Sequence, residues 1–244
     1  LHLSLRRQRQ MCIRDRLSVT TCYAFGFGER GNRNIKTKEI SISNYSVIEA
    51  LGSADVYYEQ KPNQKPYLRV EIDENLMQYV KVQVQNGILT LGTKPNTNMS
   101  PTRFRIYTNS TSLVKAGIKG SGDLYLQGKI QADKFEVYVK GSGDVSANNL
   151  NTKHLTTWIQ GSGDITLKGQ TDYLSATITG SGDLNTISLS SKNADCLIKG
   201  SGDLSVNASG QLNAEVRGSG DITYAGSPRQ LNKSVRGSGS ISKK

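Results

Sequence analysis

The sequence predicts an all-β protein folded as a parallel β-helix, or β-solenoid, in which a less regular N-terminal β-layer caps one end. Three observations lead to this fold class. A Gly-Ser-Gly-Asp tetrapeptide recurs with a period near 20 residues in the second half of the chain, which indicates one structural unit stacked repeatedly. Apolar and polar residues alternate before each copy, as in a strand with one buried face. With 25 Gly, 5 Pro and 35% hydrophobic residues, the composition suits a turn-rich stack rather than a helical globule.

Residues 1–24 are set aside from the fold. Residues 1–16 have neither a Met start nor apolar periodicity, and they resemble read-through of a sequencing adapter. Residues 17–24 resemble the end of a signal peptide, with cleavage after Ala24. Cys22 is a candidate for lipidation, although the two threonines before it depart from a lipobox. We interpret residues 1–24 as a non-native leader and a signal-peptide remnant, and expect an exported protein of the periplasm, the outer-membrane surface or the extracellular space.

The formal net charge of +11 is spread along the chain in ones and twos, apart from +4 within residues 1–16. Nucleic-acid-binding surfaces usually show a basic stripe interleaved with aromatic residues, which this sequence lacks, so no nucleic-acid partner is expected. No apolar run approaches the roughly 18 residues of a membrane-spanning helix. Beyond residue 24 the only cysteine is Cys196, so that part of the chain cannot form an intramolecular disulfide.

Residues 35–110 are expected to form the N-terminal β-layer. Gln85-Asn86-Gly87 predicts a hairpin, because Asn-Gly accepts the positive φ angles of a two-residue turn. Gly52-Ser53-Ala54-Asp55-Val56 is an altered copy of the repeated corner, and Lys94–Pro101 is expected to be a mobile loop or a junction. The expected strands are Ile40–Ser43, Asp55–Glu59, Tyr67–Ile72, Tyr79–Gln85, Ile88–Leu91 and Phe104–Tyr107.

Residues 111–244 are expected to wind seven similar coils, continuous with the N-terminal layer. The tetrapeptide begins at six glycines spaced 18 to 21 residues apart, and a Gly-Ser-Gly-Ser variant begins at Gly237. Glycine at both corner positions permits a positive φ angle and a close approach between backbones. The predicted structural glycines are Gly120, Gly122, Gly141, Gly143, Gly161, Gly163, Gly180, Gly182, Gly200, Gly202, Gly218 and Gly220.

Two short strands are expected in each coil, one on either side of the corner. The positions six, four and two before the first glycine are apolar or small, beginning with Val114, Ala116 and Ile118, and so are those four and six after it. The signature of leucine-rich repeats is absent and no helical periodicity fills the gaps, which favours the β-helix over that alternative. One coil cannot cover its own apolar face, so coils about 4.8 Å apart should share a core.

The chain also resembles a known family. Val47-Ile48-Glu49 leads into Gly52–Gln60, then Leu68–Ile72, Asn75-Leu76, Val82–Val84 and Gly87–Leu91, followed by the Gly-Ser-Gly-Asp corners. In this order the residues resemble the auto-transporter adhesin head domain, also called the GIN domain, over residues 38–244. The resemblance implies a right-handed parallel β-helix exported by Gram-negative bacteria, with an adhesin role and no catalytic residues.

The main candidate site is the column of corner aspartates, which should point outward at intervals of about 5 Å. Calcium is one interpretation, since Gly/Asp repeats on β-rolls bind this ion through carboxylate and backbone oxygens. A structural corner is favoured, because cations at the preceding outward position and hydrogen bonds to turn N–H groups can offset the repulsion between carboxylates. A ligand or glycan site is the third interpretation. The aspartates are Asp123, Asp144, Asp164, Asp183, Asp203 and Asp221, and the cations are Lys119, Lys140, Lys199, Arg217 and Arg236.

No catalytic residue, metal set or cofactor is predicted. Polysaccharide-cleaving enzymes need carboxylates in different environments, whereas aspartates repeated in identical environments cannot divide into an acid and a base. His154 is expected on the surface and Cys196 in the core. Trp158 is expected on the outer face and is the candidate for surface binding, because an exposed indole can stack on sugars or mark an interface.

These observations predict a non-enzymatic adhesion or scaffold module of the cell envelope that binds through its long regular face. The expected partner is an envelope or host-surface ligand, either a glycan or a protein. The sequence leaves open whether the chain forms a homo-oligomer. One alternative is an envelope protein that binds a glycan or lipid in a groove beside the N-terminal layer, which a deep apolar pocket would favour. The other is a carbohydrate-active enzyme, which convergent polar groups away from the aspartate column would favour.

Overall fold

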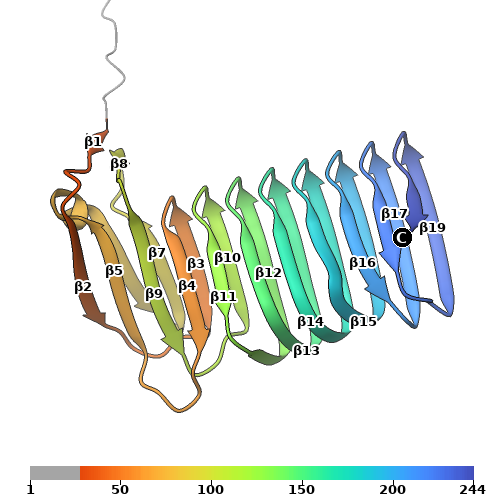
Figure 1. Cartoon of the computed structure of the whole chain (residues 1–244), viewed down its shortest axis with the longest axis horizontal. Coiled ribbons are helices and arrows are strands. Elements are labelled where there is room, and N and C mark those ends of the chain that lie inside the picture. Colours follow the sequence, from red (N-terminus) through yellow and green to blue (C-terminus); the bar gives the residue numbers. More distant parts are fainter. Residues whose placement is uncertain (1–27) are drawn as a thin grey trace, which may run out of the picture.

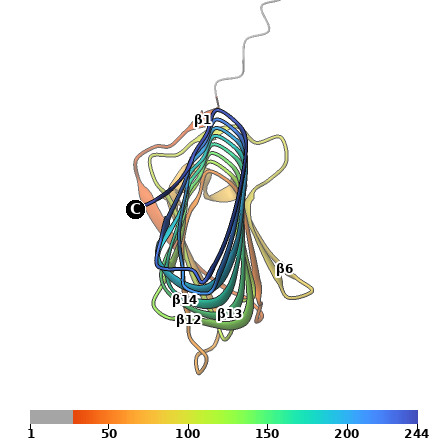
Figure 2. The same cartoon turned by 90° about the vertical axis from the view of Figure 1, so that its right-hand side faces the viewer.

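The repeat folds into an elongated stack of β-coils. The structure, a computed structural model, describes residues 28–244, so the predictions for residues 1–24, including the signal peptide and Cys22, lie outside the described residues. The coils follow one another along one axis (Figure 1), and from the C-terminal end they lie one behind another (Figure 2). The seven corners from Gly120 to Gly237 delimit about six turns. The predicted β-solenoid is confirmed.

Face A is the parallel sheet of strands that lead into each corner. Along the axis it contains β7 (Ile88–Thr93), β3 (Val47–Gly52), β10 (Lys115–Gly120), β12 (Ile130–Gly141), β13 (Val145–Gly161), β14 (Ile165–Gly180), β15 (Leu184–Gly200), β17 (Gln211–Gly218) and β19 (Gln230–Gly237). Only the C-terminal parts of β12 to β15 belong to face A, because these long strands bend into it from the preceding face. Gly52 and the seven later corner glycines occupy one register column.

Face B consists of the strands that leave each corner. It contains β9 (Phe104–Ser110), β4 (Asp55–Gln60), β11 (Leu124–Gln127), the first residues of β13 to β15, β16 (Leu204–Ala208), β18 (Ile222–Ala225) and β20 (Ile241–Lys243). A shorter face C joins B back to A and aligns residues 130–132, 150–152, 169–171 and 189–191. β3 and β4 of the N-terminal layer pair with β10 and β11 of the repetitive half. Faces A and B are therefore continuous across residue 110, the predicted boundary between the two parts.

The core is built from ladders of aligned apolar side chains. Buried and exposed residues alternate along the face A strands, and Leu155, Thr157 and Ile159 of one coil are all buried. Each buried aliphatic side chain contributes about 2 kcal/mol of hydrophobic stabilisation. The predicted inward pattern needs one correction. Val114 is 45% exposed, because β10 begins only at Lys115, and the fully buried side chain before it is Leu113.

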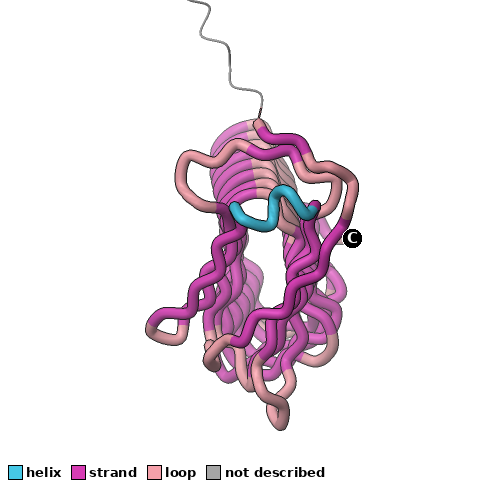
Figure 3. Tube along the Cα trace, turned by 90° about the vertical axis from the view of Figure 1, so that its left-hand side faces the viewer, coloured by secondary structure: helices cyan, strands magenta, loops and turns pink. Residues whose placement is uncertain are grey.

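The N-terminal segment ends the parallel stack with antiparallel strands and one short helix. Its elements are β1 (Glu29–Arg30), β2 (Ile35–Ser41), β5 (Tyr67–Asp73), the 3-10 helix η1 (Glu74–Tyr79), β6 (Val80–Gln85) and β8 (Met99–Ser100). β5 pairs antiparallel with β9 and with β2, and β6 pairs antiparallel with β7. η1 crosses the end of the stack between the faces (Figure 3). The layer thus covers one end of the core, where the outermost strands, β2 and β6, run antiparallel to the strands that they pair with.

Each expected strand of this layer overlaps a strand of the structure. The hairpin prediction is confirmed, since Asn86 and Gly87 have φ angles of 51° and 72° between β6 and β7. The first strand lies earlier than predicted, at β2, and the expected loop contains β8, which pairs with β1. β3 and η1 were not predicted. Among residues 28–244 no helix is long and apolar enough to cross a membrane.

Candidate functional site

Each corner is held by a close contact between the backbones of successive coils. The Gly141 carbonyl oxygen accepts hydrogen bonds from Ser162 N at 2.9 Å and Gly163 N at 3.2 Å, and the other corners repeat this pattern. From Gly120 to Gly237 the first corner glycine has φ between 134° and 157°, which disfavours other residues. A Cβ on Gly163 would lie 2.1 Å from the Gly143 carbonyl oxygen. The first glycine is therefore required both by its φ angle and by the close approach, since a Cβ on Gly161 would lie 2.2 Å from the Gly141 carbonyl oxygen, and the second is required by the close approach alone.

The corner aspartates form a hydrogen-bonded column beside this contact. Oδ1 of each accepts the backbone N–H of the next, as in the 2.8 Å bond from Asp183 N to Asp164 Oδ1. The column begins at Asp55, runs through the six predicted aspartates and ends at Ser240, whose N–H donates to Asp221. In the described part of the chain, no three His, Cys, Asp or Glu residues cluster closely enough to hold a metal ion. These carboxylates thus have a structural task, and calcium binding stays a hypothesis to be tested.

The predicted corner cations lie on the outer side of the corner, but two of them pair with other acids. Lys119 Nζ is 3.0 Å from Glu49, and Arg217 Nε is 2.7 Å from Glu215. Within residues 28–244 no ion pair joins a corner cation to a corner aspartate. The groups that directly contact the carboxylates are backbone N–H donors and, at Asp123, also the Tyr125 hydroxyl.

Two substitutions of Asp164 separate the structural role from calcium binding. Asp164→Ala should destabilise the solenoid by about 1–2 kcal/mol, because the Asp183 N–H loses a charged acceptor. Asp164→Asn keeps Oδ1 and should cost less than about 0.5 kcal/mol. Thermal unfolding of both variants, in chelator and in millimolar calcium, measures the difference. Equal losses in the two variants would contradict the structural role, and a melting temperature of the parent chain that rises with calcium would show that the column binds calcium as well.

Trp158 lies on the outer surface of face A, stacked on Tyr138 of the preceding coil. The ring centroids are 4.6 Å apart and the planes differ by 10°. Tyr138 in turn covers Gly117, where a Cβ would lie 2.2 Å from the ring. Tyr138 is fully buried by this arrangement, whereas Trp158 stays partly exposed. Both rings therefore lean toward the N-terminal end of the stack.

Polar contacts fix both rings in place. Trp158 Nε1 donates to Glu136 Oε1 at 3.0 Å, and the Tyr138 hydroxyl donates to Glu49 Oε1 at 3.2 Å. Lys115 Nζ lies 3.0 Å from Glu136 and 5.1 Å from the Tyr138 ring centroid. Burial, together with Glu49 and Glu136, raises the pKa of Tyr138 above its ordinary value, so its hydroxyl stays protonated and continues to donate. The Trp158 indole is therefore held in one orientation before any ligand binds.

A second aromatic stack lies on the outer surface of face B. Tyr57 is sandwiched between Tyr107 and Tyr125, with centroid distances of 5.0 and 4.8 Å. The Arg69 guanidinium lies 4.3 Å from the Tyr107 ring centroid, and the Tyr125 hydroxyl donates to Asp123 at 3.0 Å. Burial and the neighbouring Asp123 raise the pKa of Tyr125 to about 12. This stack offers a matched control for experiments on Trp158.

A groove of about 390 Å³ lies on the outer surface of face A, in the coils that follow Trp158. A chain of polar contacts crosses it, because Asn213 donates to Asp195 at 2.6 Å and Asn232 donates to Asn213 at 2.8 Å. The Tyr173 hydroxyl also donates to Asp195. The groove is lined by Ser175, Thr177, Asp195, Cys196, Leu197, Asn213, Ala214, Glu215, Asn232, Lys233 and Ser234. Polar groups of this groove are thus held at fixed positions, coil after coil.

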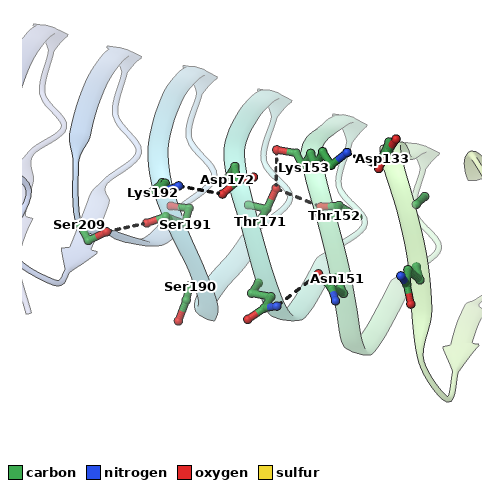
Figure 4. A pocket seen from close by; sticks show the side chains of 13 residues that line it. Asp133, Asn151, Thr152, Lys153, Thr171, Asp172, Ser190, Ser191, Lys192 and Ser209 are labelled. Atoms are coloured by element: carbon green, nitrogen blue, oxygen red, sulfur yellow. Dashed lines mark hydrogen bonds and ion pairs between the residues drawn. The ribbon is translucent and has the colours of Figure 1, made fainter.

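A larger groove of about 700 Å³ runs along the bend between faces C and A (Figure 4). Its floor is a column of buried hydroxyls, in which Thr152 Oγ1 donates to Thr171 Oγ1 at 3.0 Å. Acidic and basic side chains alternate along one wall, where they form the ion pairs Asp133–Lys153 and Asp172–Lys192 (Figure 4). Most polar groups of this groove therefore pair with one another.

Comparison with known proteins identifies the family. Residues 44–228 match the family model described as "Putative auto-transporter adhesin, head GIN domain". The chain belongs to this family. None of the curated proteins matches the GIN domain described here, but several solved structures do.

A crystal structure of a "putative lipid binding protein" from Parabacteroides distasonis is 33% identical to this GIN domain, with a TM-score of 0.76 over 88% of this chain and 98% of that one. A putative adhesin from the same species is 27% identical, with a TM-score of 0.74 over 89% of this chain and all of that one. A putative adhesin from Bacteroides fragilis has a TM-score of 0.84 over 89% of this chain and all of that one, at 24% identity. The last of these supports the fold alone.

The structure brings only some of the residues singled out in the sequence near a groove. In this GIN domain His154 is exposed, with its ring centroid 6.2 Å from that of Tyr173. Cys196 is buried, and this burial raises the pKa of its thiol, which suits a core residue. Tyr138, Asp195 and Asn213 were missed. The sequence pattern could have identified them, because each stands at an outward position three or five residues before a corner glycine, in the coils before and after Trp158.

Proposed function

We propose that this GIN domain is an exported, non-enzymatic binding module of the cell envelope that attaches to its ligand through several coils at once. The observation that carries the proposal is the arrangement of its outer polar groups, which stand in columns along grooves that span successive coils. Such a surface offers repeated contacts to an extended ligand instead of a single enclosing pocket. Acids within a column have similar environments, which suits binding better than acid–base catalysis.

The family supports a role at the cell surface. Its description and the name of one neighbouring structure, from Parabacteroides distasonis, are those of adhesins. A signal-peptide-like segment before the described residues supports export. Attachment to a surface glycan or protein of the envelope or of a host is the role that joins these observations.

Lipid binding is the second candidate, because one relative is described as a lipid-binding protein. A lipid site needs an apolar cavity that covers an acyl chain. Both grooves described above are lined mainly by hydroxyl, amide and charged side chains. This lining favours a glycan or protein ligand over a lipid.

Binding of the purified chain to a glycan array, to immobilised envelope preparations and to phosphatidylethanolamine vesicles tests the proposal. We expect saturable retention on the array or the envelope preparations, without release of new reducing ends. Failure to bind any of these surfaces would overturn the binding role, and release of reducing ends would replace it with an enzymatic one. Retention on the vesicles alone would favour the lipid alternative.

A further inference from the structure

We propose that the outer surface of face A between Trp158 and β19 is a carbohydrate site for an extended, uncharged glycan. The proposal rests on the binding role above and adds the ligand class and the residues that hold it. Three independent observations support this proposal: the Trp158 indole, the columns of polar side chains, and the charge of the groove.

The indole of Trp158 has one covered ring face and one open one. Tyr138 covers the face toward the N-terminal end. In the next coil the register places Thr177 opposite Trp158, and a threonine side chain is too short to cover an indole. The second ring face is therefore left open beside Thr177, which lines the groove, and the C–H face of a sugar ring can stack there. Because Glu136 and Tyr138 hold the indole in place, stacking requires little further ordering of the side chain.

The groove beyond Thr177 supplies the polar half of the site. Asp195 and Asn213 lie in one column, joined by the 2.6 Å hydrogen bond between them. In the neighbouring column Leu197 adds a second apolar patch, one coil beyond Thr177. A sugar ring has an apolar face and a rim of hydroxyls, and this groove presents an apolar surface beside fixed donors and acceptors. Its volume of about 390 Å³ leaves room for more than a single contact.

The charge and repeat of the groove select among carbohydrates. Glu136 and Glu215 are paired with Lys115 and Arg217. The remaining charges that line the groove are Asp195 and Lys233, so the groove has no excess positive charge to attract a carboxylate or phosphate group, which favours an uncharged glycan. The same outward positions recur once per coil, at intervals of about 4.8 Å. That interval is close to the length of one sugar unit in an extended chain, so a chain lying along the axis would meet the columns repeatedly.

Trp158 is the only tryptophan of the chain, which makes it a built-in reporter. Intrinsic fluorescence of the purified chain would be titrated with maltohexaose, cellohexaose, mannohexaose and chitohexaose. We expect a saturable change in emission with at least one of these neutral oligosaccharides, and a much smaller one with polygalacturonate fragments as the anionic control. If no neutral oligosaccharide changes the emission, the proposal is overturned.

Two variants and one control locate the site on a glycan array. Trp158→Ala should weaken binding at least tenfold, and Thr177→Gln should do the same by covering the indole while leaving its own contacts intact. Tyr57→Ala, in the matched stack on face B, should bind like the parent chain. Glycan binding that both face A variants retain would refute this site and leave the proposed function standing. Absence of binding to every glycan and envelope surface would overturn the proposed function itself.

Discussion

Gly163→Ala is expected to destabilise the solenoid by about 3 kcal/mol, although it adds a single methyl group. The new Cβ would lie 2.1 Å from the Gly143 carbonyl oxygen, which is backbone and cannot rotate away. The Gly141 carbonyl would also be pushed from Gly163 N, its partner at 3.2 Å. Because the coils above and below are both paired to this corner, the strain cannot be relieved by moving one loop. Chemical denaturation followed by circular dichroism measures the loss.

Ser162→Ala is the matched control, since it changes the exposed residue of the same corner and should shift stability by less than about 0.5 kcal/mol. A Gly163→Ala protein as stable as this control would show that the corners are not in close contact. Gly52→Ala tests the requirement for a positive φ angle alone. No atom lies within 4 Å of its added Cβ, so only its φ of +93° opposes the change, and the expected cost is about 1 kcal/mol.

The same geometry explains the altered first corner, which the sequence marks only as a departure from the repeat. Ala54 stands where later coils have the second glycine. The coil before it contains β7 and β9, which are joined by residues 94–103 instead of a tight corner. No carbonyl oxygen of a preceding corner therefore lies beneath Ala54. Glycine becomes obligatory only at Gly122, whose Cβ would meet the Ala54 carbonyl oxygen at 2.2 Å.

The repetitive half could be predicted because every coil meets the same constraint, so the corner recurs seven times and the apolar alternation before it six times. The N-terminal layer offers no such repetition. β3 was missed because its partners lie far apart in sequence, at β7 and β10. η1 was missed because its role, covering the end of the stack, depends on tertiary placement.

The candidate site was predictable in part for a related reason. Strand parity places Trp158 on the outer face, but parity does not say which way a side chain leans along the axis. The lean is set by Gly117, which leaves room for the Tyr138 ring one coil away. Nor does the aspartate spacing show that each Oδ1 accepts an N–H group from the next coil. Both are contacts between neighbouring coils, so they can be recognised only when the register between the coils is known.

Asp73 is expected to hold the N-terminal layer together, and Asp73→Ala should destabilise that layer by about 3 kcal/mol. Its buried carboxylate accepts hydrogen bonds from Arg33 N, Thr102 N and Thr102 Oγ1, each at 2.7 Å. It therefore joins the end of β5 to two segments distant in sequence. Without it the Arg33 and Thr102 donors lose their acceptor within the protein, and the buried end of β5 loses its links to both segments. Hydrogen exchange of β2 and β5 would report the loss. Asp133→Ala, which breaks an exposed ion pair with Lys153, is the control and should cost less than about 1 kcal/mol.

The contribution of Asp73 should also depend on pH with a definite sign. Burial opposes ionisation of this carboxyl, but hydrogen bonds from Thr102, Arg33 and Arg103 outweigh burial and hold its pKa below the ordinary value. Because the folded-state pKa lies below the unfolded value of about 3.9, the stabilisation is complete above that value and is lost as pH falls through the folded pKa. The difference in melting temperature between the parent chain and Asp73→Ala should thus be constant near neutral pH and shrink toward about pH 2. A difference that stays the same in acid would mean that the side chain acts through its shape and not through its charge.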